Sequence, residues 1–115
     1  MQPHTTFHIT FQRSIMQLAT TTADAENQAK KQLSKQYPNV DFRDYDIDTE
    51  FVEKRNQNNC YEVFFRDSDY VSLPLIACGN DIDDVKQTIM CNYILEHSEF
   101  KICENELTVK ELPYF

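Results

Sequence analysis

The chain has 115 residues, of which 41% are hydrophobic, and this length is typical of a single domain with one core. Its formal net charge of −8 gives a surface that repels a nucleic-acid backbone or an anionic lipid face and attracts basic proteins. The composition therefore excludes a disordered chain and argues against direct binding to nucleic acid or to a membrane.

The first half predicts two strands, a helix and a third strand. Apolar and polar residues alternate over 7–11, as in a strand with one buried face, and we expect a turn near 12–14 and a returning strand over 15–20. Thr21 or Thr22 can cap a helix, with Asp24 placed as in a capping box. The helix should carry an apolar stripe of residues at helical spacing: Ala25, Ala29, Leu33 and Tyr37. Pro38 should end it. A third strand should run over 42–52.

The second half repeats this order. Residues alternate over 61–65, a turn is expected at 67–69, and a returning strand should follow over 71–75. Gly79 and Asn80 break the chain before a helix with one apolar face, made by Ile82, Val85, Ile89 and Tyr93. A last strand is expected over 100–112. Pro74 cannot donate a ladder hydrogen bond, so we expect its strand, around 71–76, to lie at a sheet edge.

We interpret this order as a duplicated ββαβ unit, with repeats at 5–54 and 60–113 inside a single domain, 1–115. The alternative is that a common order of elements recurs by chance. Units of this size cannot each bury a sheet face and a helix alone. We therefore predict an α+β fold in which two helices pack on an antiparallel sheet of about six strands.

A row of carboxylates is the most conspicuous feature of the third strand. The period of two places Asp44, Asp46, Asp48 and Glu50 on one face, about 6.8 Å apart between neighbours. Like charges in line oppose folding, so the row is either tolerated because water and salt screen it or used by a partner. As a structural feature, it could also block aggregation at an exposed edge.

A calcium loop does not fit this row. The Asp-x-Asp-x-Asp opening of an EF-hand requires Gly at the sixth position and Glu at the twelfth, and these positions hold Thr49 and Arg55. We predict no metal site, and a looser site for a divalent cation on the same carboxylates is the alternative.

A rigid row of carboxylates can instead occupy a groove built for a nucleic-acid backbone. Glu104 and Glu106 are expected at the equivalent place on the last strand, where they would extend the acidic face. In size and charge the chain resembles small acidic proteins that inhibit bacterial defence nucleases, among them some anti-CRISPR and anti-restriction proteins.

Residues suited to catalysis are scattered. His4, His8 and His97 lie in no recognisable nucleophile, phosphate-loop or metal motif. The four cysteines have no C-x-x-C spacing, and we expect reduced, largely buried thiols. The chain opens without a signal-peptide pattern and has no run long enough to span a membrane. We predict a soluble, cytoplasmic protein, in the host cytoplasm if it is phage-encoded, that has no cofactor and is not an enzyme.

The segment 61–65, the turn 67–69, the strand 70–74 and the helix start 83–85 together resemble the beginning of the HicB-type antitoxin domain. The glycine-rich and threonine-rich link of that domain is missing here, since only Gly79 is present. The resemblance implies a protein that neutralises a small basic ribonuclease toxin, through an edge strand or the second helix.

The second helix carries further apolar residues beside its main stripe: Met90, Cys91, Ile94 and Leu95. Our first interpretation is that this helix is simply more buried than the first, and the alternative is a partner or homodimer surface. The sequence thus predicts an acidic inhibitor of a basic, nucleic-acid-binding partner. A HicB-like antitoxin and an oligomeric adaptor, dimeric through the 82–97 helix or an edge strand, are the alternatives.

Overall fold

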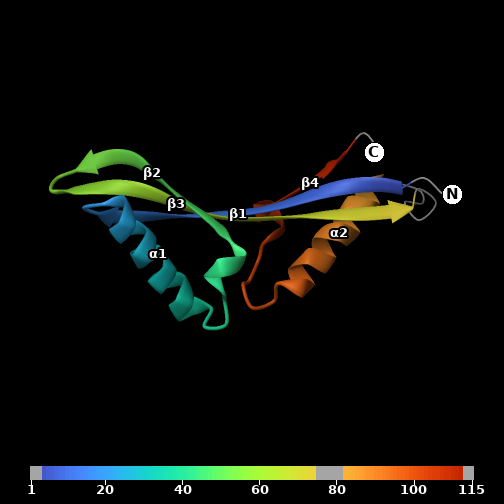
Figure 1. Cartoon of the computed structure of the whole chain (residues 1–115), viewed down its shortest axis with the longest axis horizontal. Coiled ribbons are helices and arrows are strands. Elements are labelled where there is room, and N and C mark those ends of the chain that lie inside the picture. The colour runs from blue at the N-terminus through green and yellow to red at the C-terminus, as the bar shows by residue number, and fades with distance from the viewer. Residues whose placement is uncertain (1–3, 75–81, 113–115) are drawn as a thin grey trace. The chain divides into compact units, whose positions relative to one another are not determined.

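The computed structural model describes residues 4–74 and 82–112, so the predicted break at Gly79 and Asn80 and the residues after 112 lie outside the described part. The fold is α+β, as predicted, with two helices and a four-stranded antiparallel sheet. The strand order is β2-β3-β1-β4 (Figure 1). Among the described residues, no helix is both long enough and apolar enough to span a membrane.

The strands are fewer and longer than predicted. β1 (His4–Ala19) and β3 (Asn58–Pro74) are each continuous, so the expected turns at 12–14 and 67–69 are wrong. Each predicted hairpin is one long strand, which is why the described sheet has four strands and not about six. Burial continues to alternate through the polar stretch of β1, where Gln12 and Ser14 are exposed and Arg13 is half-buried. The Arg13 guanidinium lies over the ring of Tyr37, 5.8 Å from its centroid.

The chain forms two compact units, and both long strands run through both of them. Residues 12–67 form the α1 unit, which contains α1 (Thr22–Gln36), the 3₁₀ turn η1 (Phe42–Asp44) and β2 (Asp46–Arg55). Residues 1–11 and 68–115 form the α2 unit, with α2 (Ile82–Glu96), η3 (Glu104–Glu106) and β4 (Leu107–Glu111).

Helix α1 begins as predicted. The Thr21 side chain accepts a hydrogen bond from the backbone N–H of Asp24, 3.1 Å away. The reciprocal half of the capping box is absent, because the Asp24 carboxylate accepts from the Thr20 hydroxyl instead. Ala25 and Ala29 are fully buried, and their small side chains allow the helix to lie close to the sheet. The core of this unit is completed by Leu33, Tyr45, Tyr61, Val63 and Phe65.

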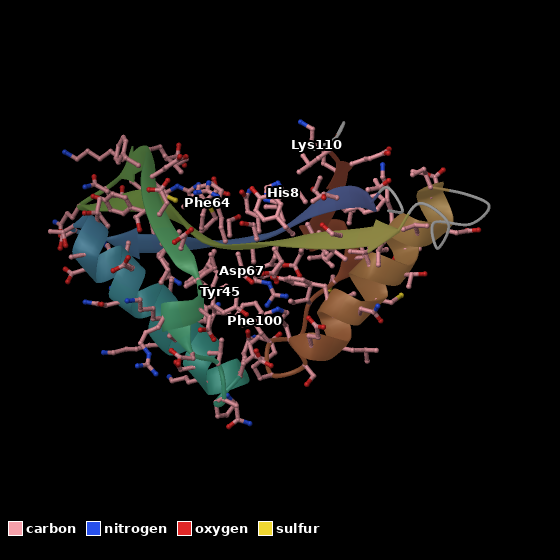
Figure 2. All side chains as sticks on the ribbon, turned by 45° about the vertical axis from the view of Figure 1, so that its right-hand side comes forward. His8, Tyr45, Phe64, Asp67, Phe100 and Lys110 are labelled. Atoms are coloured by element: carbon pink, nitrogen blue, oxygen red, sulfur yellow. The ribbon has the colours of Figure 1, made fainter. Side chains whose placement is uncertain are left out.

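The core of the α2 unit is built from β1, β4, α2 and the segment that follows the helix. β1 and β4 are antiparallel, with Ile9 opposite Val109 and Phe11 opposite Leu107. Phe100 is fully buried, and its ring contacts that of Phe11 edge to face, with centroids 5.4 Å apart. Figure 2 shows Phe100 on the α2 side of the strands of this unit, with His8 and Lys110 on the opposite face.

Both third strands begin later than predicted. Phe42 lies in η1 rather than at the start of a strand, and Phe100 precedes η3 by several residues. In each unit the chain after the helix forms a 3₁₀ turn before it enters the sheet. This order cannot be read from alternation, because a 3₁₀ turn is too short to show its own period.

Our first interpretation, that α2 is more buried than α1, is wrong. Only Ile89 and Tyr93 are buried on it, Cys91 is exposed, and the Leu95 side chain is 73% exposed. Cys103 is exposed as well, so the expectation of largely buried thiols holds only for Cys60 among the described cysteines.

Candidate functional site: the acidic face of the α1 unit

The turn before β2 fixes which residues of that strand face solvent. Asp41 caps η1 by accepting a hydrogen bond from the backbone N–H of Arg43, 3.0 Å away, and its other oxygen lies 2.8 Å from Arg43 Nη2. The hydrogen bond from the Arg43 side chain lowers the pKa of Asp41 below its usual value. Tyr45 then enters the core, which sets the phase of the following strand.

The predicted alternation is present along β2. Asp46, Asp48 and Glu50 are exposed, whereas Ile47 and Thr49 are half-buried on the other face. Asp44 is also exposed, but it belongs to η1 and not to the strand. Figure 2 shows Tyr45 and Phe64 on opposite sides of the strands of this unit, with Tyr45 on the α1 side.

The neighbouring strand adds two charged residues that sequence reasoning missed. In the β2–β3 register Asp46 lies opposite Arg66, and Glu50 lies opposite Glu62. Glu62 accepts a hydrogen bond from the Ser14 hydroxyl, 2.8 Å away. The alternation over 61–66 placed Glu62 and Arg66 on the outward face, but only the strand register brings them to the carboxylate row.

Arg66 is the cation of this face. Its Nη1 lies 3.5 Å from the Asp48 carboxylate, its Nε donates to Gln12, and its guanidinium lies 4.6 Å from the centroid of the Phe64 ring. The segment Asp46–Glu50 and the β3 residues opposite it therefore carry four carboxylates and only one guanidinium, that of Arg66. The carboxylates are those of Asp46, Asp48, Glu50 and Glu62. In the part of the chain that the structure describes, Asp46 and Glu50 have no basic group within ion-pair distance.

Further along β2 the charges are balanced. A bulge between Phe51 and Glu53 shifts the register, and beyond it the Arg55 guanidinium lies 2.6 Å from the Glu53 carboxylate. The excess of negative charge is therefore confined to the first half of the strand. We call the surface made by Asp46, Asp48, Glu50, Glu62 and Arg66 the acidic face.

The second row predicted on the last strand is not formed. Glu104 and Glu106 lie in η3, before β4 begins, and both belong to the α2 unit. Glu106 is used locally, because its carboxylate accepts a hydrogen bond from the backbone N–H of Cys103, 2.9 Å away. Neither residue extends the strand-borne row.

The histidines with described side chains lie in aromatic surroundings in the α2 unit. His8 stacks on the exposed ring of Tyr70, with centroids 4.6 Å apart, and stands opposite Lys110 in the β1–β4 register. His97 packs against Tyr93 and lies 3.8 Å from the Glu99 carboxylate. The predictions that this chain uses no catalytic residue, cofactor or metal stay predictions.

Comparison of the chain with protein-family models, with curated proteins and with solved structures finds no significant match. The interpretation of function therefore depends on the geometry of the chain itself.

Proposed function

We propose that this chain is a non-catalytic binding protein whose acidic face engages a basic partner, one that normally binds nucleic acid. The observation that carries the proposal is the pairing of Glu50 with Glu62 across β2 and β3, beside Asp46, which has no basic group within ion-pair distance among the described residues. Directly opposed like charges destabilise a sheet. An arrangement that costs folding free energy is better explained by a partner that supplies the missing cations than by solvation alone.

The spacing supports mimicry of a polyanion. Carboxylates on alternate residues of a strand repeat every 6.8 Å or so, and the strand holds them in line without a side-chain rearrangement on binding. A groove lined with Lys and Arg for a phosphodiester backbone presents cations in such an array. A nuclease complex of a bacterial defence system, in the cytoplasm, is the kind of partner that fits.

Asp44, Asp46, Asp48 and Glu50 are the residues we propose for partner binding, and Glu62 joins them from β3. Glu104 and Glu106 have less support as partner-binding residues than the sequence suggested, because both lie in η3 and Glu106 caps that turn. Arg66 has the opposite role: it lowers the charge of the face and orients Asp48.

The test compares two variants of equal net charge. The row variant carries Asp44→Lys, Asp46→Lys and Glu50→Lys, and the control variant carries Asp83→Lys, Asp84→Lys and Glu111→Lys, all exposed residues of the α2 unit. Both retain Asp48 and its contact with Arg66. Basic proteins captured from a bacterial extract by the wild-type chain at about 50 mM salt are purified, and their affinity for each variant is measured.

The row variant should bind about a hundredfold more weakly than the wild type, the control variant should bind almost normally, and duplex DNA should displace the wild-type chain. Equal weakening in both variants would mean that net charge alone governs capture and would exclude a defined acidic face. An unchanged affinity of the row variant would also exclude it.

A second role is favoured by the exposed side of α2. Leu95 is 73% exposed and borders a shallow depression with Ile94 and Ile102, a surface suited to an oligomeric adaptor. Concentration-dependent dimerisation in light scattering, removed by Leu95→Lys, would support it.

We also propose that the chain arose by duplication, with repeats at 5–54 and 60–113. Support comes from the order strand, helix, 3₁₀ turn and strand, which occurs twice along the chain.

A further inference from the structure

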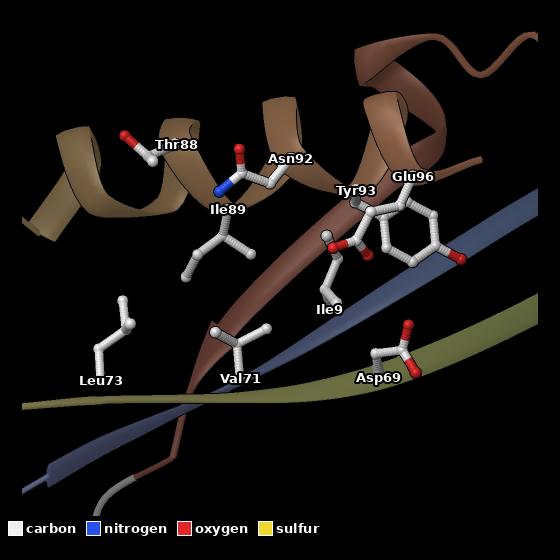
Figure 3. Close-up of a pocket in the computed structure, with 9 residues that line it drawn as sticks. All are labelled: Ile9, Asp69, Val71, Leu73, Thr88, Ile89, Asn92, Tyr93 and Glu96. Atoms are coloured by element: carbon white, nitrogen blue, oxygen red, sulfur yellow. The ribbon is translucent and has the colours of Figure 1, made fainter. Parts of the chain in front are cut away.

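The α2 unit contains a pocket of about 200 Å³ between its helix and its sheet. Ile9, Val71 and Leu73 line it from the strands, and Ile89 and Tyr93 line it from α2. Figure 3 shows these side chains directed toward the space between helix and strands, with Asp69 on the strand side and Glu96 on the helix side of one end. The walls are mostly apolar, and the charge is confined to that end.

The same stretch of β3 forms an edge of the sheet. β2 pairs with β3 only from Asn58 to Arg66, so Tyr70–Leu73 continue beyond the end of their neighbour. Among the residues that the structure describes, no strand pairs with Tyr70–Leu73 on the side where β2 would lie. Backbone groups of an edge strand are available to pair with another chain.

The volume indicates what the pocket can hold. Sites for small-molecule ligands usually enclose roughly 300–1,000 Å³, and this pocket is smaller. It suits one or two side chains delivered by a backbone that lies outside. An edge strand next to a pocket between helix and sheet supplies that geometry, because the incoming backbone pairs with the edge and its alternate side chains point toward the helix.

Alternation along β3 predicts the sequence that would fit. Asp69, Val71 and Leu73 line the pocket in turn, so a strand paired with this edge would place alternate side chains beside these three. A cation is favoured beside Asp69, where Glu96 adds a second carboxylate, and aliphatic side chains are favoured beside Val71 and Leu73.

We propose that the α2 unit binds an extended segment of another protein by strand addition at Tyr70–Leu73. The segment carries one Lys or Arg that reaches Asp69 and Glu96, and two aliphatic residues on the same face that enter the pocket. This site goes beyond the proposed function, because it lies in the other unit and depends on main-chain pairing and apolar contact. Failure of either proposal leaves the other intact.

The probes are two heptapeptides with blocked ends. Ser-Val-Ser-Val-Ser-Lys-Ser places its side chains correctly in an antiparallel strand, and Ser-Lys-Ser-Val-Ser-Val-Ser does so in a parallel one. We expect one of them to cause saturable amide shifts in the NMR spectrum of the full chain, centred on Val71, Leu73 and Ile89. Replacing its Lys by Glu should weaken binding about tenfold. Methylation of the backbone nitrogens on its pairing edge should abolish binding, because the ladder hydrogen bonds are lost.

The matched variants are both on the exposed surface of α2. Asn92→Arg places a bulky cation in the pocket, whereas Gln87→Arg adds the same charge to the same helix outside the pocket residues. Asn92→Arg should weaken binding of the favoured peptide about tenfold, and Gln87→Arg should leave it unchanged. The proposal is overturned if neither peptide gives saturable shifts, if the shifts map outside the α2–β3 pocket, or if the Lys-to-Glu peptide binds equally well.

Discussion

Arg66 and Asp48 form the one ion pair within the acidic face, with Arg66 Nη1 3.5 Å from the Asp48 carboxylate. The guanidinium also covers the ring of Phe64 and donates to Gln12, so it is held in place by three different contacts. Because both charged side chains are partly exposed, the pair adds little to stability. Its consequence is electrostatic, since it neutralises one carboxylate of the row and leaves its neighbours unbalanced.

The β2–β3 register predicts opposite effects for two similar substitutions. Glu50→Lys should raise the free energy of unfolding by about 0.5–1 kcal/mol, because a repulsive pair with Glu62 becomes an attractive one. Asp46→Lys should lower it by a similar amount, because the new cation faces Arg66. Urea denaturation of the two variants and the wild type measures both. A change of the same sign in both variants would contradict the register.

The stability of η1 should depend on pH through the protonation of the Asp41 carboxylate. The hydrogen bond from Arg43 lowers the Asp41 pKa from its ordinary value of 3.8, so this contact stabilises the turn above the unfolded-state pKa and is lost as the pH falls through the lowered one. In Arg43→Gln the pKa should move upward toward 3.8, while the backbone hydrogen bond keeps it from exceeding that value. An NMR titration of the Asp41 carboxyl carbon measures the shift. An Asp41 pKa that is the same in both proteins would contradict the contact.

Features that depend on neighbouring residues along the chain could be predicted from the sequence. The Thr21 cap, the buried stripe of Ala25, Ala29 and Leu33, and the outward direction of Asp46, Asp48 and Glu50 all follow from local spacing. The register between two strands, in contrast, depends on residues that lie far apart along the chain. The positions of Glu62 and Arg66 beside the row therefore became known only from the structure.

The continuity of β1 and β3 could not be inferred from their polar interruptions. Asp67, Ser68 and Asp69 have the composition of a turn, but they lie in the middle of a strand. One signal was present in the sequence: Val63 and Phe65 share their odd-numbered phase with Val71 and Leu73, as they would in a single strand. The turn propensity of these polar residues conflicts with this phase, and tertiary packing favours the continuous strand.

Two phenylalanines of the α1 unit should differ sharply in their contribution to stability. Phe65 is fully buried and its ring lies 5.8 Å from that of Phe42, so Phe65→Ala should cost about 3–5 kcal/mol. Phe51 is 59% exposed and contacts mainly Tyr61, so Phe51→Ala should cost less than about 1 kcal/mol. Chemical denaturation of both variants tests the assigned core, and equal losses would show that it is wrong.

Thiol labelling provides a test of the exposure of three cysteines. Cys91 on α2 and Cys103 before η3 are exposed, whereas Cys60 on β3 is buried. A maleimide added to the native protein should therefore modify Cys91 and Cys103 within minutes, and Cys60 should react only as the chain unfolds, at a rate set by opening of the α1 unit. Peptide mapping by mass spectrometry assigns each modification. Addition of urea supplies the control, since Cys60 must then react as fast as the other two. Rapid native labelling of Cys60 would mean that the strands of the α1 unit open far more readily than their burial implies.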